Sequence, residues 1–412
     1  MKKKKSGKKL KVLGIILSVI LIIAIAFASM TAVAMKGNLK KANSFPEVGC
    51  NLKYENKGNG VWEIYADKEL KVIQLTDVHL GGGWMSKNKD AMSINAVASM
   101  LKAEKPDFVI VTGDIAYPVP FQAGTFNNKN GARLFATLME KLGIYWTVCY
   151  GNHDTEAYSY FSREDITKFY SGDEYPHCLL QSGPEDVDGC GNQIFKIINS
   201  EGKITRALFA IDSHSYIDGD IFGIQWKYDN IHENQIEWYK NSITAMNKEN
   251  ADKGFKGVVP SNVFMHIPMT EYKDAWQEYV ENGFKDTENV KHKYGTTGET
   301  DMGIFCGIHE DKFFEAMQEL GSTDAVFCGH DHLNNFCLEY KGINLVYGMS
   351  IDYLAYFGIS KLGTQRGCTV ISIAPDGAIN WVPESYYQDK YESFYEKEPV
   401  TMQDLLKEAT AE

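Results

Sequence analysis

Short apolar runs followed by polar clusters recur along the chain from Val61 onward. Continuous apolar runs of four to eight residues are typical of strands that are buried on both faces of a sheet. Five such runs end beside carboxylate, amide or imidazole side chains, and they read KVIQLT, DFVIVTG, YWTVCYGN, NVFMH and DAVFCGH. A further strand of this type is predicted over Ala207–Ile211.

Helical patterns lie between several of the predicted strands. Apolar residues recur at helical spacing in Ser93–Lys105, Ala132–Leu142, Asn234–Ala245 and Lys312–Leu320. Alternation of strands and helices predicts a layered α/β core. Lys285–Gly303 is polar and rich in Gly and Thr, so we expect a surface loop near the site, and Gln403–Ala411 is expected to form a short amphipathic helix.

The N-terminal segment has a different pattern. Val12–Met35 contains 24 residues without a charge, enough for a helix to cross about 30 Å of hydrocarbon. Seven lysines precede it, which predicts a cytoplasmic N-terminus and an exported remainder. A cleaved signal peptide is the alternative, because Ala32-Val33-Ala34 offers a cleavage site, although signal-peptide apolar cores usually have only about 7–15 residues.

These patterns predict five parts of the chain. They are a cytoplasmic basic segment (1–11), a transmembrane anchor or signal peptide (12–35), a tether (36–60), a catalytic domain (61–395) and a C-terminal tail with a possible helix (396–412). The predicted location is therefore the cell membrane, single-pass with an extracytoplasmic catalytic domain, or secretion if the signal is cleaved. The sequence carries no signal for an oligomeric state.

Composition and charge narrow the class of protein. Apolar residues make up 44% and charged residues 23% of the 412 residues, which excludes a disordered chain, a collagen and a small disulfide scaffold. The net charge is −12, but the seven N-terminal lysines conceal a more acidic body with 35 basic and 54 acidic residues. Such a body is a poor match for the nucleic-acid backbone, so no nucleic-acid partner is expected.

The eight cysteines are scattered without a C-x-x-C spacing, which gives no support for a zinc ribbon or a thioredoxin-like motif. Cys149 and Cys328 lie in apolar strand-like runs and are expected to be buried free thiols. Export permits disulfides, and Cys178 with Cys190 is one possible local pair.

The polar clusters supply the candidate chemistry. In chain order they are Asp77-Val-His79, Gly113-Asp114, Gly151-Asn152-His153-Asp154, His266 and Gly329-His330-Asp331-His332. Ligands of open α/β sheets collect beyond the carboxyl ends of the strands, where these clusters lie. Two divalent metal ions, such as Mn, Fe or Zn, need this mixture of carboxylate, imidazole and amide ligands.

The specificity of the pattern comes from the whole set. D-x-H by itself is uninformative, because Asp212-Ser213-His214 has the same form after another strand. G-N-H-D and G-H-x-H are more specific, and five clusters in order at strand ends favour a metal site over hydrogen-bonded structural histidines. A buried set of this kind without an ion would be costly. The glycines at 113, 151 and 329 are expected to let the backbone turn sharply. Gly81-Gly82-Gly83 is expected either to let a phosphate group come close to the backbone or to form a flexible loop.

The ordered set resembles the calcineurin-like metallophosphoesterase superfamily over about residues 70–375. Five stretches between Gly151 and Cys337 also look like the purple-acid-phosphatase-related branch of fungi and plants: GNHDTE, LFAIDSHSY, QIEWY, FMHIPMTEY and CGHDHLNNFC. The resemblance implies a four-layer α/β/β/α sandwich with a dinuclear metal centre. It assigns the ligands as follows: Asp77, His79 and His332 to one metal, Asn152, His266 and His330 to the other, and Asp114 as the bridge.

The same resemblance implies phosphate-ester hydrolysis by a metal-bound hydroxide, with His153 as the general acid. Asp154 or Asp331 is expected either to orient an imidazole or to serve in a turn, and Asp154 is assigned with His153 to the catalytic residues. Tyr117 matches a tyrosine that binds ferric iron in true purple acid phosphatases, but those enzymes lack the histidine present here as His79. We therefore interpret His79 as the ligand and Tyr117 as its neighbour.

The expected function is an exported, metal-dependent phosphoesterase with a small phosphate ester, preferably a monoester, as its substrate. Two alternatives stay open: a phosphodiesterase acting on nucleotides or lipid head groups, and a non-catalytic envelope protein that keeps the fold as a binding module. Protein phosphatases of the Ser/Thr branch would have Asp at position 117, which counts against that identity. Asp212 and His214 either line the cleft or form a satisfied loop pair.

Overall fold

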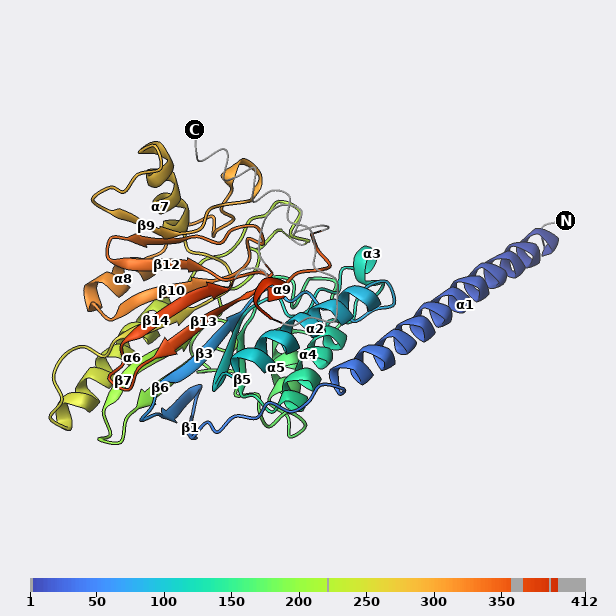
Figure 1. Cartoon of the computed structure of the whole chain (residues 1–412). Helices are drawn as coiled ribbons and strands as arrows, with labels where there is room; N and C mark the ends of the chain where they lie inside the picture. Colours follow the sequence, from blue (N-terminus) through green and yellow to red (C-terminus); the bar gives the residue numbers. More distant parts are fainter. Residues whose placement is uncertain (1–2, 221, 357–365, 385–386, 392–412) are drawn as a thin grey trace.

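Two β-sheets lie face to face in the computed structural model, with helices on their outer faces (Figure 1). The structure describes residues 3–220, 222–356, 366–384 and 387–391. The smaller sheet has the order β14-β13-β3-β4-β5, with β3 (Leu70–Leu75), β4 (Phe108–Thr112), β5 (Trp146–Cys149), β13 (Cys368–Ile373) and β14 (Ile379–Glu384).

The larger sheet has the order β1-β2-β6-β7-β8-β10-β12-β11-β9. Its strands are β1 (Tyr54–Gly58), β2 (Val61–Tyr65), β6 (Gln193–Ile198), β7 (Ile204–Ala210), β8 (Ser261–Phe264), β9 (Val290–Tyr294), β10 (Thr323–Cys328), β11 (Cys337–Tyr340) and β12 (Ile343–Tyr347). Within this sheet β8, β10 and β12 are parallel neighbours, as β3, β4 and β5 are in the smaller sheet.

The helices complete the outer layers. They are α1 (Lys3–Ala42), α2 (Lys87–Glu104), α3 (Pro120–Ala123), α4 (Asn128–Leu142), α5 (Arg163–Tyr170), α6 (Glu233–Asp252), α7 (Thr270–Glu281), α8 (Phe313–Leu320) and α9 (Tyr387–Lys390), with a short 3₁₀ helix η1 (Thr300–Met302). The four segments predicted as helices fall within or largely overlap α2, α4, α6 and α8.

Alternating side chains of the central strands divide the apolar core into three parts. Val72 of β3 packs between the two sheets, whereas its neighbour Ile73 packs beneath α2 and α4. A third cluster lies between the larger sheet and α6, α7 and α8. Three apolar interfaces separate four layers, so the predicted α/β/β/α sandwich is confirmed.

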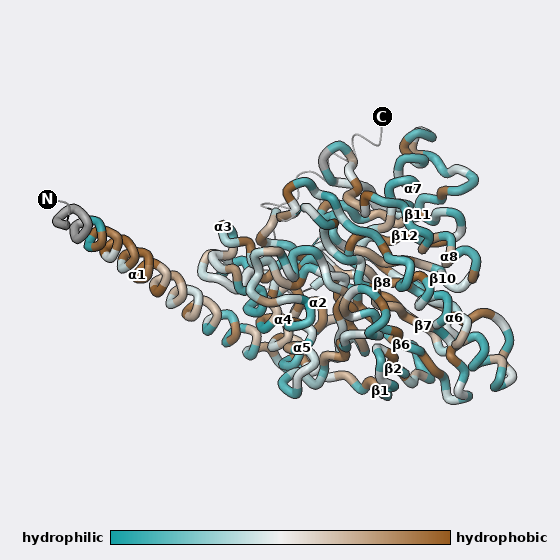
Figure 2. The backbone as a smooth tube through the Cα atoms, turned by 180° about the vertical axis from the view of Figure 1, so that it is seen from behind, coloured by the Kyte–Doolittle hydropathy of each residue, from teal (hydrophilic) through white to brown (hydrophobic). Residues whose placement is uncertain are grey.

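The N-terminal helix is longer than the predicted apolar span. α1 runs without a break from Lys3 to Ala42, and its first part projects from the sandwich (Figure 1). The projecting part is strongly apolar, as the brown colour of Figure 2 shows. Among the described residues, α1 is the one helix long and apolar enough to cross a membrane. Its last turns pack on α2 and α4, where Ala34, Met35 and Ala42 are buried.

Two predictions about segments are wrong, and a third is untested. Residues 36–60 are not a tether, because α1 continues to Ala42 and Tyr54–Gly58 forms strand β1, which pairs with β2 and so belongs to the larger sheet. Lys285–Gly303 is not a plain loop, since it contains β9, the edge strand paired with β11. The helix predicted over Gln403–Ala411 and the tail that contains it lie outside the described residues.

The cysteine predictions have separate outcomes. Cys149 and Cys328 are buried free thiols, as expected. The possible Cys178–Cys190 disulfide is absent, because both residues are free thiols and the Cys190 sulfur lies 3.1 Å from the Thr167 hydroxyl.

Candidate metal centre

Five strands, three in the smaller sheet and two in the larger, place their carboxyl ends at one edge of the sandwich, where the candidate ligands gather. In the smaller sheet Asp77 follows β3, Asp114 follows β4 and Asn152 follows β5. In the larger sheet His266 follows β8, and His330 and His332 follow β10. Because the strands of each group are parallel neighbours, residues far apart in the sequence meet at this edge.

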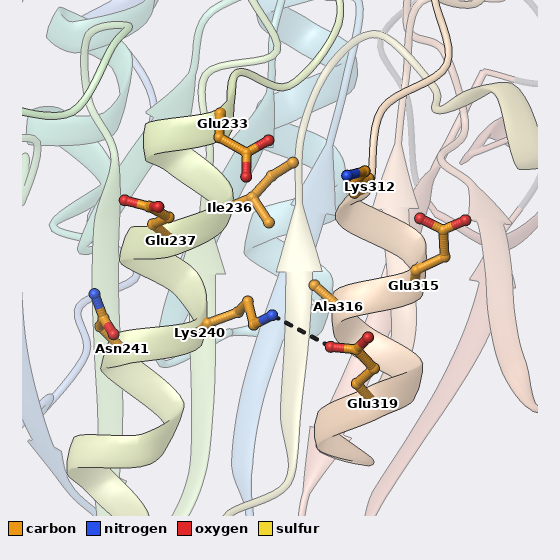
Figure 3. Close-up of a pocket in the computed structure, with 9 residues that line it drawn as sticks. All are labelled: Glu233, Ile236, Glu237, Lys240, Asn241, Lys312, Glu315, Ala316 and Glu319. Carbon is orange, nitrogen blue, oxygen red and sulfur yellow. Dashed lines mark hydrogen bonds and ion pairs between the residues drawn. The ribbon is translucent and has the colours of Figure 1, made fainter.

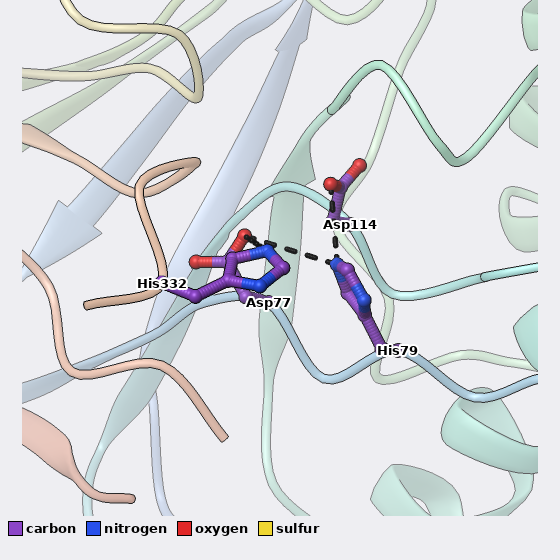
Figure 4. A group of neighbouring side chains, drawn as sticks. All are labelled: Asp77, His79, Asp114 and His332. Atoms are coloured by element: carbon purple, nitrogen blue, oxygen red, sulfur yellow. Dashed lines mark hydrogen bonds and ion pairs between the residues drawn. The ribbon is translucent and has the colours of Figure 1, made fainter. Parts of the chain in front are cut away.

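One group of four buried side chains comes from both sheets (Figure 4). Asp77, His79, Asp114 and His332 each offer one ligand atom, and these atoms lie within 4.8 Å of one another. His79 Nε2 is 3.3 Å from Asp114 Oδ2 and 4.0 Å from Asp77 Oδ1, and His332 Nε2 is 3.5 Å from the same Asp77 oxygen.

A second group of donor atoms lies on the other side of Asp114. His266 Nε2 is 3.3 Å from Asp114 Oδ2, 3.2 Å from Asn152 Oδ1 and 3.2 Å from His330 Nδ1. Asp114 Oδ2 is therefore at the same distance from an imidazole of each group.

The donor atoms suit bound cations. Zinc ligands lie about 2.0–2.2 Å from the ion, so ligand atoms around one ion are separated by roughly 3.0–3.6 Å. The separations in the site run from 3.2 to 4.0 Å, and all but the His79–Asp77 distance of 4.0 Å fall within this range. Nε2 of His330 is also buried without a hydrogen-bond partner among the described residues. Facing carboxylates and imidazoles in a buried cluster fit divalent metal ions in type and spacing.

The backbone at the ligands is held in an unusual conformation. Asp77, His79, Asp114 and His330 have positive φ angles between 49° and 78°, a region that non-glycine residues seldom adopt. The ligand loops hold one another there, because the N–H of Asp77 donates to the Gly113 carbonyl and that of His79 to the Asp114 carbonyl. Such strain clusters at functional sites, where the surrounding structure enforces it.

At two of the three glycines beside the ligands, Gly151 and Gly329, any side chain would collide with a neighbouring residue. Gly113 has a positive φ of 86°, as predicted for a sharp turn, but Gly151 and Gly329 do not. A Cβ atom at Gly151 would lie 2.1 Å from Asp114 Oδ1, and one at Gly329 would lie 1.9 Å from the Thr76 hydroxyl. The predicted reason is thus wrong for these two positions, where the close approach of neighbouring side chains requires glycine.

Asp352 orients two of the candidate ligands and is absent from the set predicted from the sequence. Its Oδ1 lies 3.6 Å from His79 Nδ1, and its Oδ2 lies 3.4 Å from His332 Nδ1. Burial raises the pKa of Asp352, but the two imidazoles and backbone N–H donors outweigh that effect and lower it far below its usual range. A carboxylate that binds the far nitrogen of an imidazole fixes the ring and leaves Nε2 for a metal.

The sequence signal for Asp352 was available. The residue follows β12, whose apolar run INLVYGMS precedes it in the way that the other apolar runs precede their ligands. Two further orienting contacts lack such a signal: the Thr112 carbonyl lies 2.8 Å from His266 Nδ1, and Asn152 Nδ2 donates to the Tyr216 hydroxyl over 2.9 Å. The latter contact leaves Oδ1 of Asn152 facing His266.

His153 stands beside both groups and is partly exposed, with 24% of its side chain accessible. Its backbone N–H donates to Asp114 Oδ1, and its Nδ1 lies 2.7 Å from the buried carboxylate of Glu156. Burial lowers the pKa of His153, but the charges of Asp114 and Glu156 outweigh burial and raise it above its ordinary value. The protonated imidazole is thereby favoured at this position.

Asp154 and Asp331 do not orient imidazoles through the hydrogen bonds that the structure describes. The Asp154 carboxylate accepts from the backbone N–H groups of Asp114, Ala116 and Gly151. Asp331 accepts from the Tyr347 hydroxyl over 2.5 Å and from the Phe305 N–H. The predicted catalytic assignment of Asp154 is therefore corrected to a positioning role, in which it holds the loops after β4 and β5 together.

The glycine triplet after His79 is neither a phosphate cradle nor a flexible loop. The N–H groups of Gly81 and Gly82 donate to the buried Asp90 carboxylate, and that of Gly83 donates to the Ser86 hydroxyl. Its donors are already satisfied within the protein, so they are not free to bind phosphate.

Tyr117 is a neighbour of the first group. Its ring stacks on His79 with 4.6 Å between ring centres, and its hydroxyl donates to Gln122 Oε1 over 2.9 Å. Burial raises the pKa of Tyr117, which favours the neutral phenol.

Asp212 and His214 form a separate structural pair. Asp212 makes an ion pair with Arg163 and accepts from the Cys190 N–H over 2.8 Å. His214 stacks on His232 with 4.0 Å between ring centres and reaches Gln235 through Nε2. The structure thus favours the satisfied loop pair over a cleft lining.

A surface groove between α6 and α8 lies apart from the metal centre (Figure 3). Its volume is about 410 Å³, and Lys240 and Glu319 form an ion pair across it. None of its nine lining residues is a candidate ligand, so the groove is not part of the metal site.

Comparison with known proteins gives a consistent set of matches. The family model described as calcineurin-like phosphoesterase matches residues 70–334. The chain is 28% identical to a protein of Arabidopsis thaliana named probable inactive purple acid phosphatase 14, over 78% of this chain and 79% of that protein. It is also 28% identical to phosphatase DCR2 of Saccharomyces cerevisiae, over 66% of this chain and 45% of that protein.

Solved structures give a more distant match. A dimetal phosphatase from Danio rerio is similar with a TM-score of 0.43 and 11% identity, over 77% of this chain and all of that one.

A second plant protein, probable inactive purple acid phosphatase 29 of Arabidopsis thaliana, is 27% identical over 74% of this chain and 77% of its own length.

Proposed function

We propose that this chain, which belongs to the calcineurin-like phosphoesterase family, is a membrane-anchored phosphomonoesterase with a dinuclear metal centre. Family membership and the buried Asp-His-Asp-His group make it a metal-dependent phosphoesterase. The observation that carries the finer proposal is the position of Asp114 Oδ2, 3.3 Å from an imidazole nitrogen of each donor group. One carboxylate between two sets of ligands is the arrangement that a pair of ions requires.

The two ions would have separate protein ligands. Asp77, His79 and His332 would hold one, Asn152, His266 and His330 would hold the other, and Asp114 would bridge them. When bound, divalent ions neutralise phosphate oxygens and make water a nucleophile near neutral pH. The contribution of Asp352, Thr112 and Tyr216 is to keep the ligand atoms turned toward the ions.

His153 would act as the general acid. It lies beside Asp114, it is partly exposed, and Glu156 favours its protonated form. Glu156 lies 2.7 Å from Nδ1, so the proton at Nε2 would be the one donated to the departing alcohol oxygen. The role of Glu156 is to position the ring and to maintain its charge.

The names of the Arabidopsis relatives include the word inactive, which makes the completeness of this site important. All seven candidate ligands and His153 are present and lie at one edge of the sandwich. The non-catalytic alternative would gain support from a missing ligand or a missing acid, and this chain lacks neither.

The anchor proposal draws on the packing of α1. The possible signal-cleavage site, Ala32-Val33-Ala34, lies inside the helix, and Ala34 is buried against the catalytic domain. Cleavage after Ala34 would require this part of the helix to leave the domain and unwind. We therefore favour an uncleaved anchor, with the lysines in the cytoplasm and the catalytic domain outside.

The experiment that tests the function uses the full chain purified in detergent. Bound metal is measured after loading with Mn²⁺, Fe²⁺ or Zn²⁺, and turnover is then measured on a panel of phosphate monoesters and diesters. We expect two metal ions per chain and faster turnover of monoesters. A preference for diesters would support the phosphodiesterase alternative. Fewer than one bound ion per chain, together with no turnover, would contradict the proposal that the chain is an enzyme.

Two variants separate the bridge from the acid. His153→Asn is expected to lower kcat by about 10²–10⁴-fold and to leave the metal content unchanged, because the lost group donates a proton without holding a metal. Asp114→Asn is expected to lose metal. Equal metal content in the two variants would contradict these roles.

A further inference from the structure

An apolar groove separates α1 from the catalytic domain. It has a volume of about 800 Å³ and is lined on one side by α1 residues from Ala24 to Leu39. On the other side it is lined by α3, the start of α4 and the segment around Trp84. The ring of Phe27 stacks on that of Trp84, with 5.6 Å between ring centres. The catalytic domain therefore contacts α1 well inside the apolar part of the helix.

Large apolar side chains surround this groove on the surface of the domain. We call Trp84, Met85, Phe121, Phe126 and Tyr160 the aromatic rim; all five line the groove. Phe121 is 89% exposed, and Met85, Phe126 and Tyr160 are exposed as well. The exposure of so many large apolar side chains beside an apolar helix indicates an interaction surface.

The length of α1 determines the depth of the rim. Any twenty consecutive residues of the 24-residue charge-free span would fill the hydrocarbon core, so its outer boundary lies between Thr31 and Met35. Phe27 then lies about 6–12 Å inside that boundary, at 1.5 Å per residue. Trp84 lies against Phe27, so the rim is at the level of the outer leaflet.

We propose that the aromatic rim is embedded in the outer leaflet and that lipid acyl chains fill the groove between it and α1. This inference depends on the uncleaved anchor of the proposed function. Both Figure 1 and Figure 2 show α3, which carries Phe121, on the side of the domain toward the projecting part of α1.

The rim is connected to the metal centre by two short segments. Phe121 is seven residues after Asp114, and Tyr160 is seven residues after His153, so neither is more than about 25 Å from its partner. Gln122 accepts from the Tyr117 hydroxyl and donates to the carbonyls of Leu354 and Ala355. The segment that carries Phe121 is thus hydrogen-bonded to the loop that carries Asp352, and its Tyr117 ring stacks on His79.

The substrate class follows from this placement. An embedded rim holds the metal centre close to the membrane surface, so the substrates we infer are phosphate monoesters carried by lipids of the same leaflet. Water would add its oxygen to phosphorus as the bond to the lipid oxygen breaks, and His153 would supply the proton to that oxygen. The products are a lipid alcohol that stays in the membrane and inorganic phosphate.

The first experiment measures depth without using activity. A bimane label is placed at Phe121→Cys in the full chain, with Cys50 and Cys306 replaced by Ser because they are the partly exposed native thiols. The chain is reconstituted in phosphatidylcholine vesicles with lipids that carry a nitroxide quencher at defined depths. The control is Val258→Cys, which is 48% exposed and lies ahead of β8, at the end of the strand opposite the ligands.

We expect the nitroxide lipids to quench the label at position 121 at least threefold more than the label at position 258. Equal quenching of the two labels would overturn the embedded rim. Intact mass measured before reconstitution reports whether the N-terminus is retained, and a mass showing cleavage after Ala34 would overturn the inference together with its anchor.

The second experiment measures substrate preference. The full chain in the same vesicles is given phosphatidic acid as a lipid monoester and p-nitrophenyl phosphate as a soluble monoester. Phe121→Asp is expected to lower kcat/KM for phosphatidic acid at least tenfold and to change that for the soluble ester less than twofold. Val258→Asp, the matched control, is expected to change neither.

The outcomes distinguish the inference from the proposed function. If the wild type hydrolysed neither ester, the phosphomonoesterase proposal would be contradicted. The quenching experiment alone would then decide whether the aromatic rim is embedded in the membrane. Turnover of the soluble ester alone, or equal effects of Phe121→Asp on both esters, would overturn the lipid substrate class and leave the phosphomonoesterase intact.

Discussion

At the scale of single residues, the candidate metal centre depends on the acceptors behind its imidazole rings. Asp352 faces the rings of His79 and His332, and the Thr112 carbonyl faces that of His266. The other ring nitrogen, Nε2, then faces a ligand. It faces Asp114 in His79, Asp77 in His332 and Asn152 in His266. The geometry of the ligands is therefore set by residues that would not touch a metal ion.

Replacement of Asp352 tests this dependence. Asp352→Asn keeps the size of the side chain but removes the charge that holds two imidazoles, so we expect metal affinity to fall by about 10–100-fold. Competition with a chelator, followed by titration with Zn²⁺ or Mn²⁺, measures the change. Asp220→Asn is the matched control, because Asp220 is also buried but accepts from the backbone of a loop. Unchanged affinity in Asp352→Asn would contradict the orienting role.

At the scale of elements, the parallel strands and the loops that follow them form the site. The ligand loops pair with one another through backbone hydrogen bonds, and Asp154 joins the loops after β4 and β5. The helices contribute by covering the outer faces of both sheets, where their apolar side chains are buried. One helix, α7, also has a half-buried acidic group, Glu271, in its first turn.

That acidic group makes stability depend on pH. Burial is the main cause that raises the pKa of Glu271 to about 7, and Asp311 adds to the effect. As the pH rises from about 4.5 to 7, the unfolded state loses this proton before the folded state does, so the free energy of unfolding falls. The fall is at most about 3 kcal/mol for this group.

Glu271→Gln removes the titrating group, so we expect the free energy of unfolding to decrease less between pH 4.5 and 7 than it does in the wild type. Chemical denaturation at several pH values in a metal-saturated buffer gives the two curves. Glu237→Gln, at an exposed position of α6, is the matched control and is expected to follow the wild type. Parallel curves for wild type and Glu271→Gln would show that the prediction is wrong.

At the scale of the whole molecule, the metal centre joins the two sheets. Asp77, Asp114 and Asn152 follow strands of the smaller sheet, whereas His266, His330 and His332 follow strands of the larger one. Ions held by both sets would link the halves of the sandwich in the folded state alone. Metal binding should therefore raise the stability of the entire domain.

Removal of metal is the corresponding test. A metal present at 100 to 1,000 times its dissociation constant contributes about 2.7–4.1 kcal/mol, so we expect a chelator to lower the Tm of the catalytic domain by about 4–6 °C. Thermal unfolding before and after EDTA measures the shift, and added metal should reverse it. Asp114→Asn should not respond to EDTA, and a wild type equally insensitive to EDTA would contradict metal binding that links the sheets.

The sequence by itself determined the features that depend on local patterns. Apolar runs identified the strands that precede the five ligand clusters, and the charge-free span identified the apolar part of α1. These features can be predicted from the sequence because a buried strand and a membrane-length helix each need a particular hydrophobic pattern. The set of ligands followed, since their residue types and their places after strands are local properties.

The tertiary structure decided which distant groups meet. It brought Asp352 to His79, directed Asp154 to backbone N–H groups, and packed the residues after Met35 on the domain, where a tether was expected. It also brought the rim beside α1, although its residues are dispersed from Trp84 to Tyr160. Side-chain partners and buried surfaces arise from contacts between segments far apart in the chain, and no local pattern of hydrophobic and polar residues encodes them.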